Sequence, residues 1–169
     1  MTTETTSSRR PLVARLADRL PGFGGYRDRE RRRDADRLLR EHVAVELTAA
    51  RDAVRAEAAR RTDAGDLGAL RGLDRLERSL DRLAQTVRFA EHGATGLFAE
   101  NIVRAERLDA IYRHDLAVAD DVADLRRSID AGFDAAEIES RIAALDSRWS
   151  ARRALLDGAS VPGGSREEI

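Results

Sequence analysis

The chain of 169 residues contains no cysteine and no lysine. Without cysteine it can form no disulfide or thiolate metal site, and it has no thiol nucleophile. Every basic side chain is an arginine. Together with the abundant alanine, this usage indicates a GC-rich coding sequence, and we give it no functional weight.

Long hydrophobic runs are also missing. No apolar stretch approaches the roughly 20 residues that a bilayer core requires. Residues 11–20 are interrupted by Arg15, Asp18 and Arg19, so they do not resemble the apolar region of a signal peptide. From these absences we expect a cytoplasmic protein, with peripheral membrane contact as an alternative.

Charge of one sign does not dominate either. The chain has 30 basic and 31 acidic residues, which nearly cancel. This balance argues against polyanion binding by the molecule as a whole. A nucleic-acid partner is not expected, because the basic run at 27–33 is interleaved with acids and stacking aromatics are few.

Apolar residues recur at helical spacing along most of the chain. Successive stripes predict helices over about 27–61, 67–92 and 96–130, and a fourth from Asp134 to just before Gly158. Connections of about four or five residues make sequential helices run antiparallel. The predicted fold class is all-α, an elongated coiled-coil-like antiparallel four-helix bundle. Its expected organisation is a disordered tail at 1–10, an amphipathic segment and Gly/Pro hinge at 11–26, the bundle at 27–157 and a disordered tail at 158–169.

Local signals mark helix starts and exposed faces. Asp134 and Glu137 have capping-box spacing at the start of the last helix, and Asp66 is a predicted N-cap for the helix at 67–92. Acid-before-base pairs four residues apart are expected on exposed faces. Examples are Asp36–Arg40, Asp74–Arg78 and Glu137–Arg141.

Catalytic and metal-binding patterns are not visible. None of the three histidines, His42, His92 and His114, follows a glutamate by three positions, so the Glu-x-x-His motif of di-metal bundles is missing. No nucleophile elbow, Walker loop or dinucleotide fingerprint occurs. We therefore predict no catalytic residue, no metal and no cofactor.

One polar residue stands where an apolar one is expected. Asp115 lies in the stripe formed by Ile111 and Val118, and Arg104 and Asn101 also fall towards the inner side of that helix. Asp115 either pairs with an arginine of another helix and sets the register of the bundle, or belongs to a polar ligand pocket or active site. The favoured interpretation is the ion pair.

The N-terminal quarter is locally basic. Residues 1–40 carry 11 arginines and 6 acids, a net charge of +5. An amphipathic segment followed by this charge is typical of a surface that binds an anionic membrane or an acidic partner, although its leucines could instead fold onto the bundle. The candidate interaction surface comprises Leu12, Leu16, Leu20, Phe23, Tyr26, Arg27, Arg29, Arg31, Arg32 and Arg33.

Two stretches carry a resemblance. PGFGGYRDRERRRDADRLLR (21–40), and EHGATGLFAE (91–100) followed by LDAIYRHDL (108–116), resemble an uncharacterised family of small helical bacterial proteins. Those proteins have a Pro-Gly-x-x-Gly-Tyr hinge before a basic helix and a Gly-x-x-Gly-x-Phe turn later. The resemblance spans most of residues 20–157. It implies a shared fold and no activity, and it adds weight to Tyr26, Gly93, Gly96, Phe98, Tyr112 and Asp115.

The leading functional hypothesis is a non-enzymatic helical bundle that acts through protein–protein contact, with a homodimer as one form. Phe89, which lies off the apolar seam of its helix, is a candidate for a second contact face. The alternatives are binding to an anionic membrane surface through residues 11–33, and a ligand-binding or enzymatic bundle with a pocket around Asp115.

Overall fold

The protein folds into long helices. The computed structural model describes residues 4–25, 29–90, 104–132 and 134–157, without the side chains of 4–11, 29 and 30. No strand occurs in these ranges. The described helices are α1 (Glu4–Arg19), α2 (Arg29–Asp63), α3 (Leu70–Arg88), α5 (Ala105–Ala131) and α6 (Ala135–Asp157).

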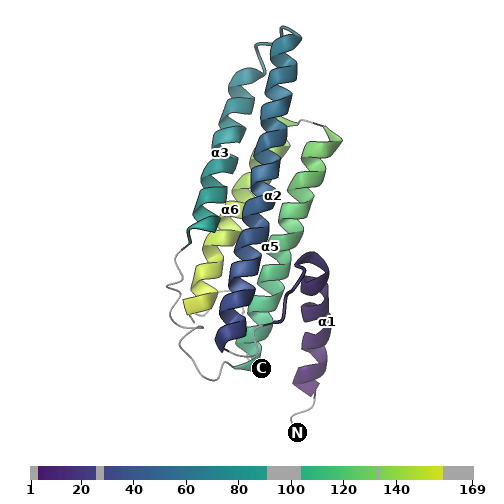
Figure 1. The fold of residues 1–169 in the computed structure, drawn as a ribbon, viewed down its shortest axis with the longest axis vertical. Coiled ribbons are helices and arrows are strands. Elements are labelled where there is room, and N and C mark those ends of the chain that lie inside the picture. Colours follow the sequence, from purple (N-terminus) through teal and green to yellow (C-terminus); the bar gives the residue numbers. More distant parts are fainter. Residues whose placement is uncertain (1–3, 26–28, 91–103, 133, 158–169) are drawn as a thin grey trace, which may run out of the picture.

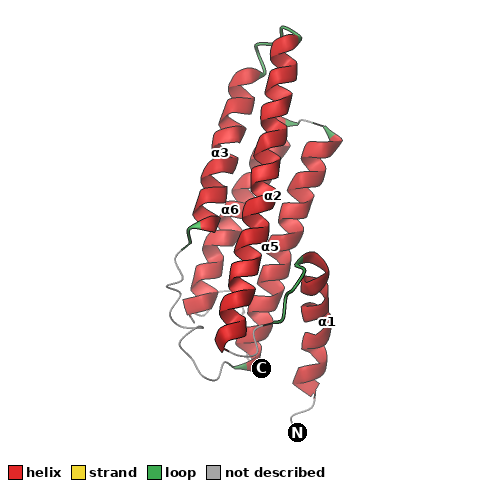
Figure 2. Cartoon of the chain, in the orientation of Figure 1, coloured by secondary structure: helices red, strands yellow, loops and turns green. Residues whose placement is uncertain are grey.

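Four of the helices form an elongated bundle, in which α2 runs antiparallel to α3 and α5 antiparallel to α6, while the contacting pairs α2–α5 and α3–α6 run parallel (Figure 1). Contacts join α2 to α3, α3 to α6, α6 to α5 and α5 back to α2, so these helices close a ring around one core. The α2–α3 hairpin projects beyond the α5–α6 hairpin at one end (Figure 2). With 35 residues, α2 is about 50 Å long. The predicted fold class is therefore confirmed.

The core consists mainly of the apolar stripes that the sequence predicts. Leu39, Val43 and Leu47 of α2 are fully buried, and Leu80 of α3 and Ile138 of α6 are buried to the same degree. Because these side chains recur every three or four residues, each helix presents one continuous apolar face to its neighbours. The central part of the bundle is thus filled mainly by apolar side chains.

Helix ends were predicted unevenly. At the start of α6, the carboxylate of Asp134 accepts hydrogen bonds from the backbone N–H groups of Ala136 (3.0 Å) and Glu137 (3.1 Å), which confirms Asp134 as the N-cap. The prediction for Asp66 was wrong, because α3 begins at Leu70 and the Asp66 carboxylate pairs with Arg61. The predicted start of the helix at 96 lies outside the described residues.

Helix α1 lies outside the ring and packs only on α5 among the described helices. It begins at Glu4, so the expected disorder through residue 10 is corrected for residues 4–10. The predicted hinge follows it: Gly22 and Gly25 have φ of +88° and +80°, which glycine adopts without strain. A β-carbon at Gly25 would stand 3.0 Å from the Tyr112 hydroxyl, so the hinge passes close against α5.

Candidate functional site

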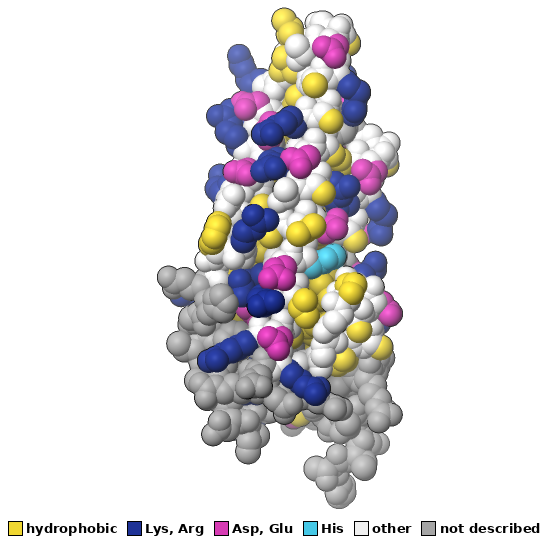
Figure 3. Space-filling model, in the orientation of Figure 1, with side chains coloured by type: hydrophobic (Ala, Val, Ile, Leu, Met, Phe, Trp, Pro, Cys, Tyr) yellow, Lys and Arg dark blue, Asp and Glu magenta, His cyan; other side chains and the backbone are white. Residues whose placement is uncertain are grey.

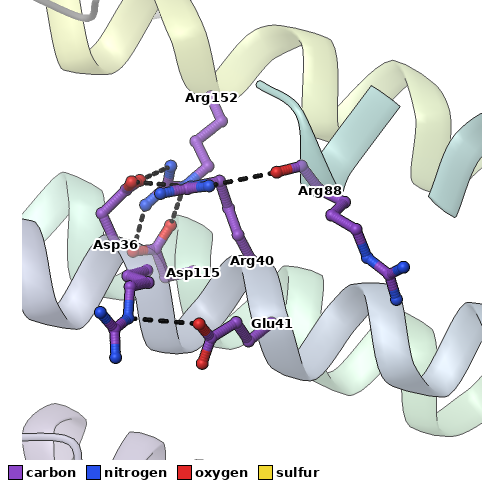
Figure 4. A network of polar contacts seen from close by, with 7 residues as sticks. Asp36, Arg40, Glu41, Arg88, Asp115 and Arg152 are labelled. Carbon is purple, nitrogen blue, oxygen red and sulfur yellow. Dashed lines mark hydrogen bonds and ion pairs between the residues drawn. The ribbon is translucent and has the colours of Figure 1, made fainter. Parts of the chain in front are cut away.

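Two aspartates and two arginines meet inside the bundle, near the end where α2 begins and α6 ends (Figure 4). Arg152 donates to Asp115 through Nε (2.7 Å) and Nη2 (3.3 Å), and to Asp36 through Nη1 (2.7 Å). The second oxygen of Asp36 accepts from Arg40 Nε at 2.9 Å. Arg40 also donates to the backbone carbonyl of Arg88 at 3.3 Å. We call Asp36, Arg40, Asp115 and Arg152 the buried polar network.

Each member stands at a core position of its helix. Asp36 continues the apolar stripe of α2 backwards by one turn, and Asp115 interrupts the stripe of α5. Arg152 occupies the helical turn between Trp149 and Leu156, and both of those side chains are buried. The network therefore links α2, α5 and α6 directly, and it reaches the last turn of α3 through Arg40.

Burial and charge explain why the network is stable. No member is more than 6% exposed, and Asp115 is fully buried. Two carboxylates face two guanidinium groups, so the formal charge is balanced. The Arg152 guanidinium also lies 5.3 Å from the centre of the Trp149 ring, a cation–π distance. Balanced, hydrogen-bonded charges can be held in an interior that would expel any one of them alone.

Among the described residues, little of the network is open to a ligand. The adjoining surface groove, about 280 Å³, is lined by Arg37, Arg40, Glu41, Val45 and Arg88. It reaches the network only at Arg40, and the two aspartates and Arg152 do not line it. Asp115 therefore pairs with an arginine of another helix, as the favoured sequence interpretation expected.

The other residues predicted beside Asp115 do not join it. Arg104 is exposed at the start of α5, so its predicted inward position was wrong. Asn101 lies outside the described residues. The sequence did not predict the other three members, Asp36, Arg40 and Arg152. The spacing of Asp36 and Arg40 had indicated an exposed pair. Extending the stripe of α2 back by one turn would have placed Asp36 in the core, and the gap between Trp149 and Leu156 in the stripe of α6 would have placed Arg152 there.

The predicted N-terminal interaction surface is largely turned inward. Leu16, Leu20 and Phe23 are buried against the bundle, and Phe23 meets the Tyr112 ring edge-on at 6.3 Å. Arg19 on the same helix pairs with Asp120 of α5 at 2.8 Å. The apolar face of α1 is thus already used by α5.

The remaining residues of that surface fall into three groups. Leu12 is partly buried and packs on the core, and Arg32 is only 1% exposed. Arg31 and Arg33 are exposed. Tyr26, Arg27 and the side chain of Arg29 lie outside the described residues. The alternative in which the leucines fold onto the bundle is therefore confirmed for Leu16 and Leu20, and Arg32 is removed from the candidate surface because it is buried.

The two described histidines are partly buried. Desolvation lowers the pKa of His114, although its ring contacts the Arg148 carbonyl oxygen at 2.9 Å and lies near Asp115. Desolvation also lowers the pKa of His42, against the opposing effect of Glu46. No group of three or more histidine or acidic side chains that could hold a metal ion occurs in the described part of the chain.

Among the described helices, none has the length and apolar character needed to cross a bilayer. The chain matches no protein-family model, no curated protein and no solved structure.

Proposed function

We propose that this protein is a non-enzymatic helical bundle that acts by binding another protein on its outer surface. The observation that carries the proposal is the mutual pairing of the buried polar network. Its two carboxylates and two guanidinium groups bind one another, and none of the four residues is more than 6% exposed. A substrate would have to break these ion pairs to reach them, and an arrangement of this kind serves packing rather than chemistry.

The outer surface has features suited to contact. Three large apolar side chains are exposed in the described residues: Val45 (58%), Leu67 (66%) and Phe89 (71%). Exposed aromatic and aliphatic side chains on rigid helices are common anchors of protein interfaces. In this bundle they lie on α2 and at the two ends of α3, and not on α1.

Membrane binding through α1 has less support. Its leucines would have to leave α5, which would expose apolar surface on both helices and break the Arg19–Asp120 ion pair. That loss would have to be recovered from the bilayer before any net binding occurred. Docked as it is, α1 functions as part of the bundle.

Site-specific photo-crosslinking in cells tests the proposal. A photoreactive residue is placed on four exposed faces, one per helix of the ring: Ala59, Gln85, Arg113 and Ser150. We expect discrete protein adducts from one or two neighbouring faces and none from the others. Absence of a protein adduct from every face would contradict the proposal. An adduct of twice the monomer mass only, together with a dimer in light scattering, would instead establish a homodimer.

A further inference from the structure

The outer face of α3 carries a straight row of arginines. Arg71, Arg75, Arg78 and Arg82 are all exposed and follow one another at intervals of four, three and four residues. This spacing keeps them on one face of the helix, opposite the buried leucine seam. At 1.5 Å per residue the row is about 16 Å long. We call these four side chains the arginine ridge, and Figure 3 shows basic side chains repeated along the edge of the molecule where α3 lies.

The acidic residues of α3 do not neutralise the ridge. Asp81 pairs with Arg51 of α2 at 2.9 Å, and Glu77 pairs with Arg55 of the same helix. Asp74 pairs with Arg78, the one member of the ridge with an acidic partner. Among the described residues, Arg71, Arg75 and Arg82 have no acidic partner. The charge of the ridge is therefore available to another molecule.

Apolar side chains bracket the ridge. Leu67 precedes it in the turn before α3, and Phe89 follows Arg82 by seven residues, which places it on the same side of the helix. A groove of about 390 Å³ borders its first end and is lined by Arg61, Arg71 and Arg75, among others. The surface thus combines a line of positive charge with an apolar contact at each end.

We infer that the arginine ridge docks an acidic helical segment of a partner protein. Carboxylates at the same four-three-four spacing on a facing helix would meet the guanidinium groups one for one, and the ends of that helix would cover Leu67 and Phe89. Charge complementarity of this kind sets the register and speeds association. This inference rests on the proposed function and specifies the partner.

The width of the ridge favours a helix over a flat polyanion. The row is one residue wide, and the acids Asp74, Glu77 and Asp81 lie along its flank facing α2. A membrane or a nucleic-acid duplex presents its charge over a broad surface, of which only one line could contact the ridge. A helix with carboxylates along one face matches the width of the row.

A second copy of this chain does not fit the ridge. A symmetric contact through the outer face of α3 would set arginine against arginine, because both partners use the same patch. No helix in the described ranges has acidic residues at four successive positions with the required spacing. The occupant is therefore a different protein.

Binding of designed peptides tests the inference on the full chain. The probe is a helical peptide with glutamates at i, i+4, i+7 and i+11, and its control has the same composition with the glutamates distributed around the helix. The variant R71Q/R75Q/R82Q removes the unpaired charges of the ridge. The matched control R37Q/R113Q/R153Q removes three exposed arginines elsewhere. Fluorescence anisotropy measures the affinities, and circular dichroism checks that each variant folds.

We expect the native chain to prefer the striped peptide, with an affinity that falls as salt rises. The ridge variant should bind it about tenfold more weakly, and the control variant within about twofold of the native chain. The variant R71E/R75E/R82E should bind a matching lysine peptide in its place. Equal weakening by both glutamine variants, no preference between the two glutamate peptides, or tighter ridge-dependent binding to anionic vesicles or duplex DNA would overturn the inference. If the inference fails in one of these ways, photo-crosslinks to a protein from a face other than that of α3 would still support the proposed function.

Discussion

The two ends of the bundle solve the problem of burial in different ways. At the end where α5 meets α6 through their turn, the interior is filled by apolar side chains such as Ile129, Ile138 and Leu145. At the opposite end, charged side chains stand in the core-facing stripes of the helices. They are Asp36, Arg40, Asp115 and Arg152. Apolar packing stabilises any arrangement of suitable volume, whereas ion pairs with fixed geometry select one alignment of helices. We therefore expect the polar end to define how α2, α5 and α6 align.

The largest expected effect is loss of one charge from the polar end. In Asp115→Leu, the Arg152 guanidinium stays buried and loses two hydrogen bonds. We expect the free energy of unfolding to fall by about 3–5 kcal/mol, because an uncompensated buried charge is left behind. Urea unfolding followed by circular dichroism measures it. An unchanged or higher stability would show that the network does not depend on Asp115.

A cavity at the apolar core should cost somewhat less. Leu47 of α2 is fully buried, and Leu47→Ala removes several methyl and methylene groups from close packing. The expected loss is about 2–4 kcal/mol, the combined cost of lost transfer free energy and a residual cavity. The same urea titration applies. A loss well above that of Asp115→Leu would reverse the ranking of the two regions.

Replacing the whole network at once separates its stability from its specificity. The variant D36L/R40M/D115L/R152M removes two buried carboxylates and two buried guanidinium groups together. We expect a stability within about 2 kcal/mol of the native chain, in either direction, since a well-packed apolar replacement often matches a buried ion-pair cluster. Amide dispersion in NMR spectra should narrow if helix alignment becomes degenerate. A loss as large as that of Asp115→Leu would mean that the network contributes net stability.

The apolar end of the bundle could be predicted from the sequence, whereas most of the polar end could not. The apolar stripes repeat over many turns, so residues such as Leu80 and Val43 identify their helices and faces without ambiguity. Asp36 and Arg40 have the spacing of an ordinary exposed pair, and only the neighbouring helices make them buried. Local spacing cannot reveal a partner 116 residues away, as Arg152 is for Asp36.

Asp115 was identifiable because apolar residues surround it within its own stripe. The partner of that aspartate was not, since an arginine near a helix C-terminus usually interacts with the helix dipole in solvent. The arginine ridge was missed for a related reason. The numbers of basic and acidic residues in the chain are nearly equal, so the composition gives no sign of the ridge. Only the structure shows that Asp81 and Glu77 pair with α2 and not with the arginines of the ridge.

A smaller effect is expected at the turn between α5 and α6, where the apolar end closes. Asp134→Ala removes the acceptor for two backbone N–H groups at the start of α6. The loss should be about 1 kcal/mol, the usual value of an N-cap side chain. Thermal unfolding measures it, with Asp134→Asn as the control that retains a capping oxygen. Equal losses in both variants would assign the effect to charge and not to the hydrogen bonds.

The smallest effect concerns pH and acts beside the polar end. The pKa of His114 is lowered in the folded state, chiefly by desolvation. The unfolded chain therefore takes up a proton first, near pH 6.5, so the stability present above that pH is lost as the pH falls towards the lowered value. In His114→Gln this loss should shrink, since glutamine does not titrate and its amide can still donate to the Arg148 carbonyl oxygen. Urea midpoints between about pH 7.5 and pH 5.5 measure the difference. If the urea midpoint falls equally with pH in both proteins, His114 has the same pKa in the folded and unfolded chains. Protonation of His114 would then have no effect on the stability of the folded chain, in spite of the nearby Asp115.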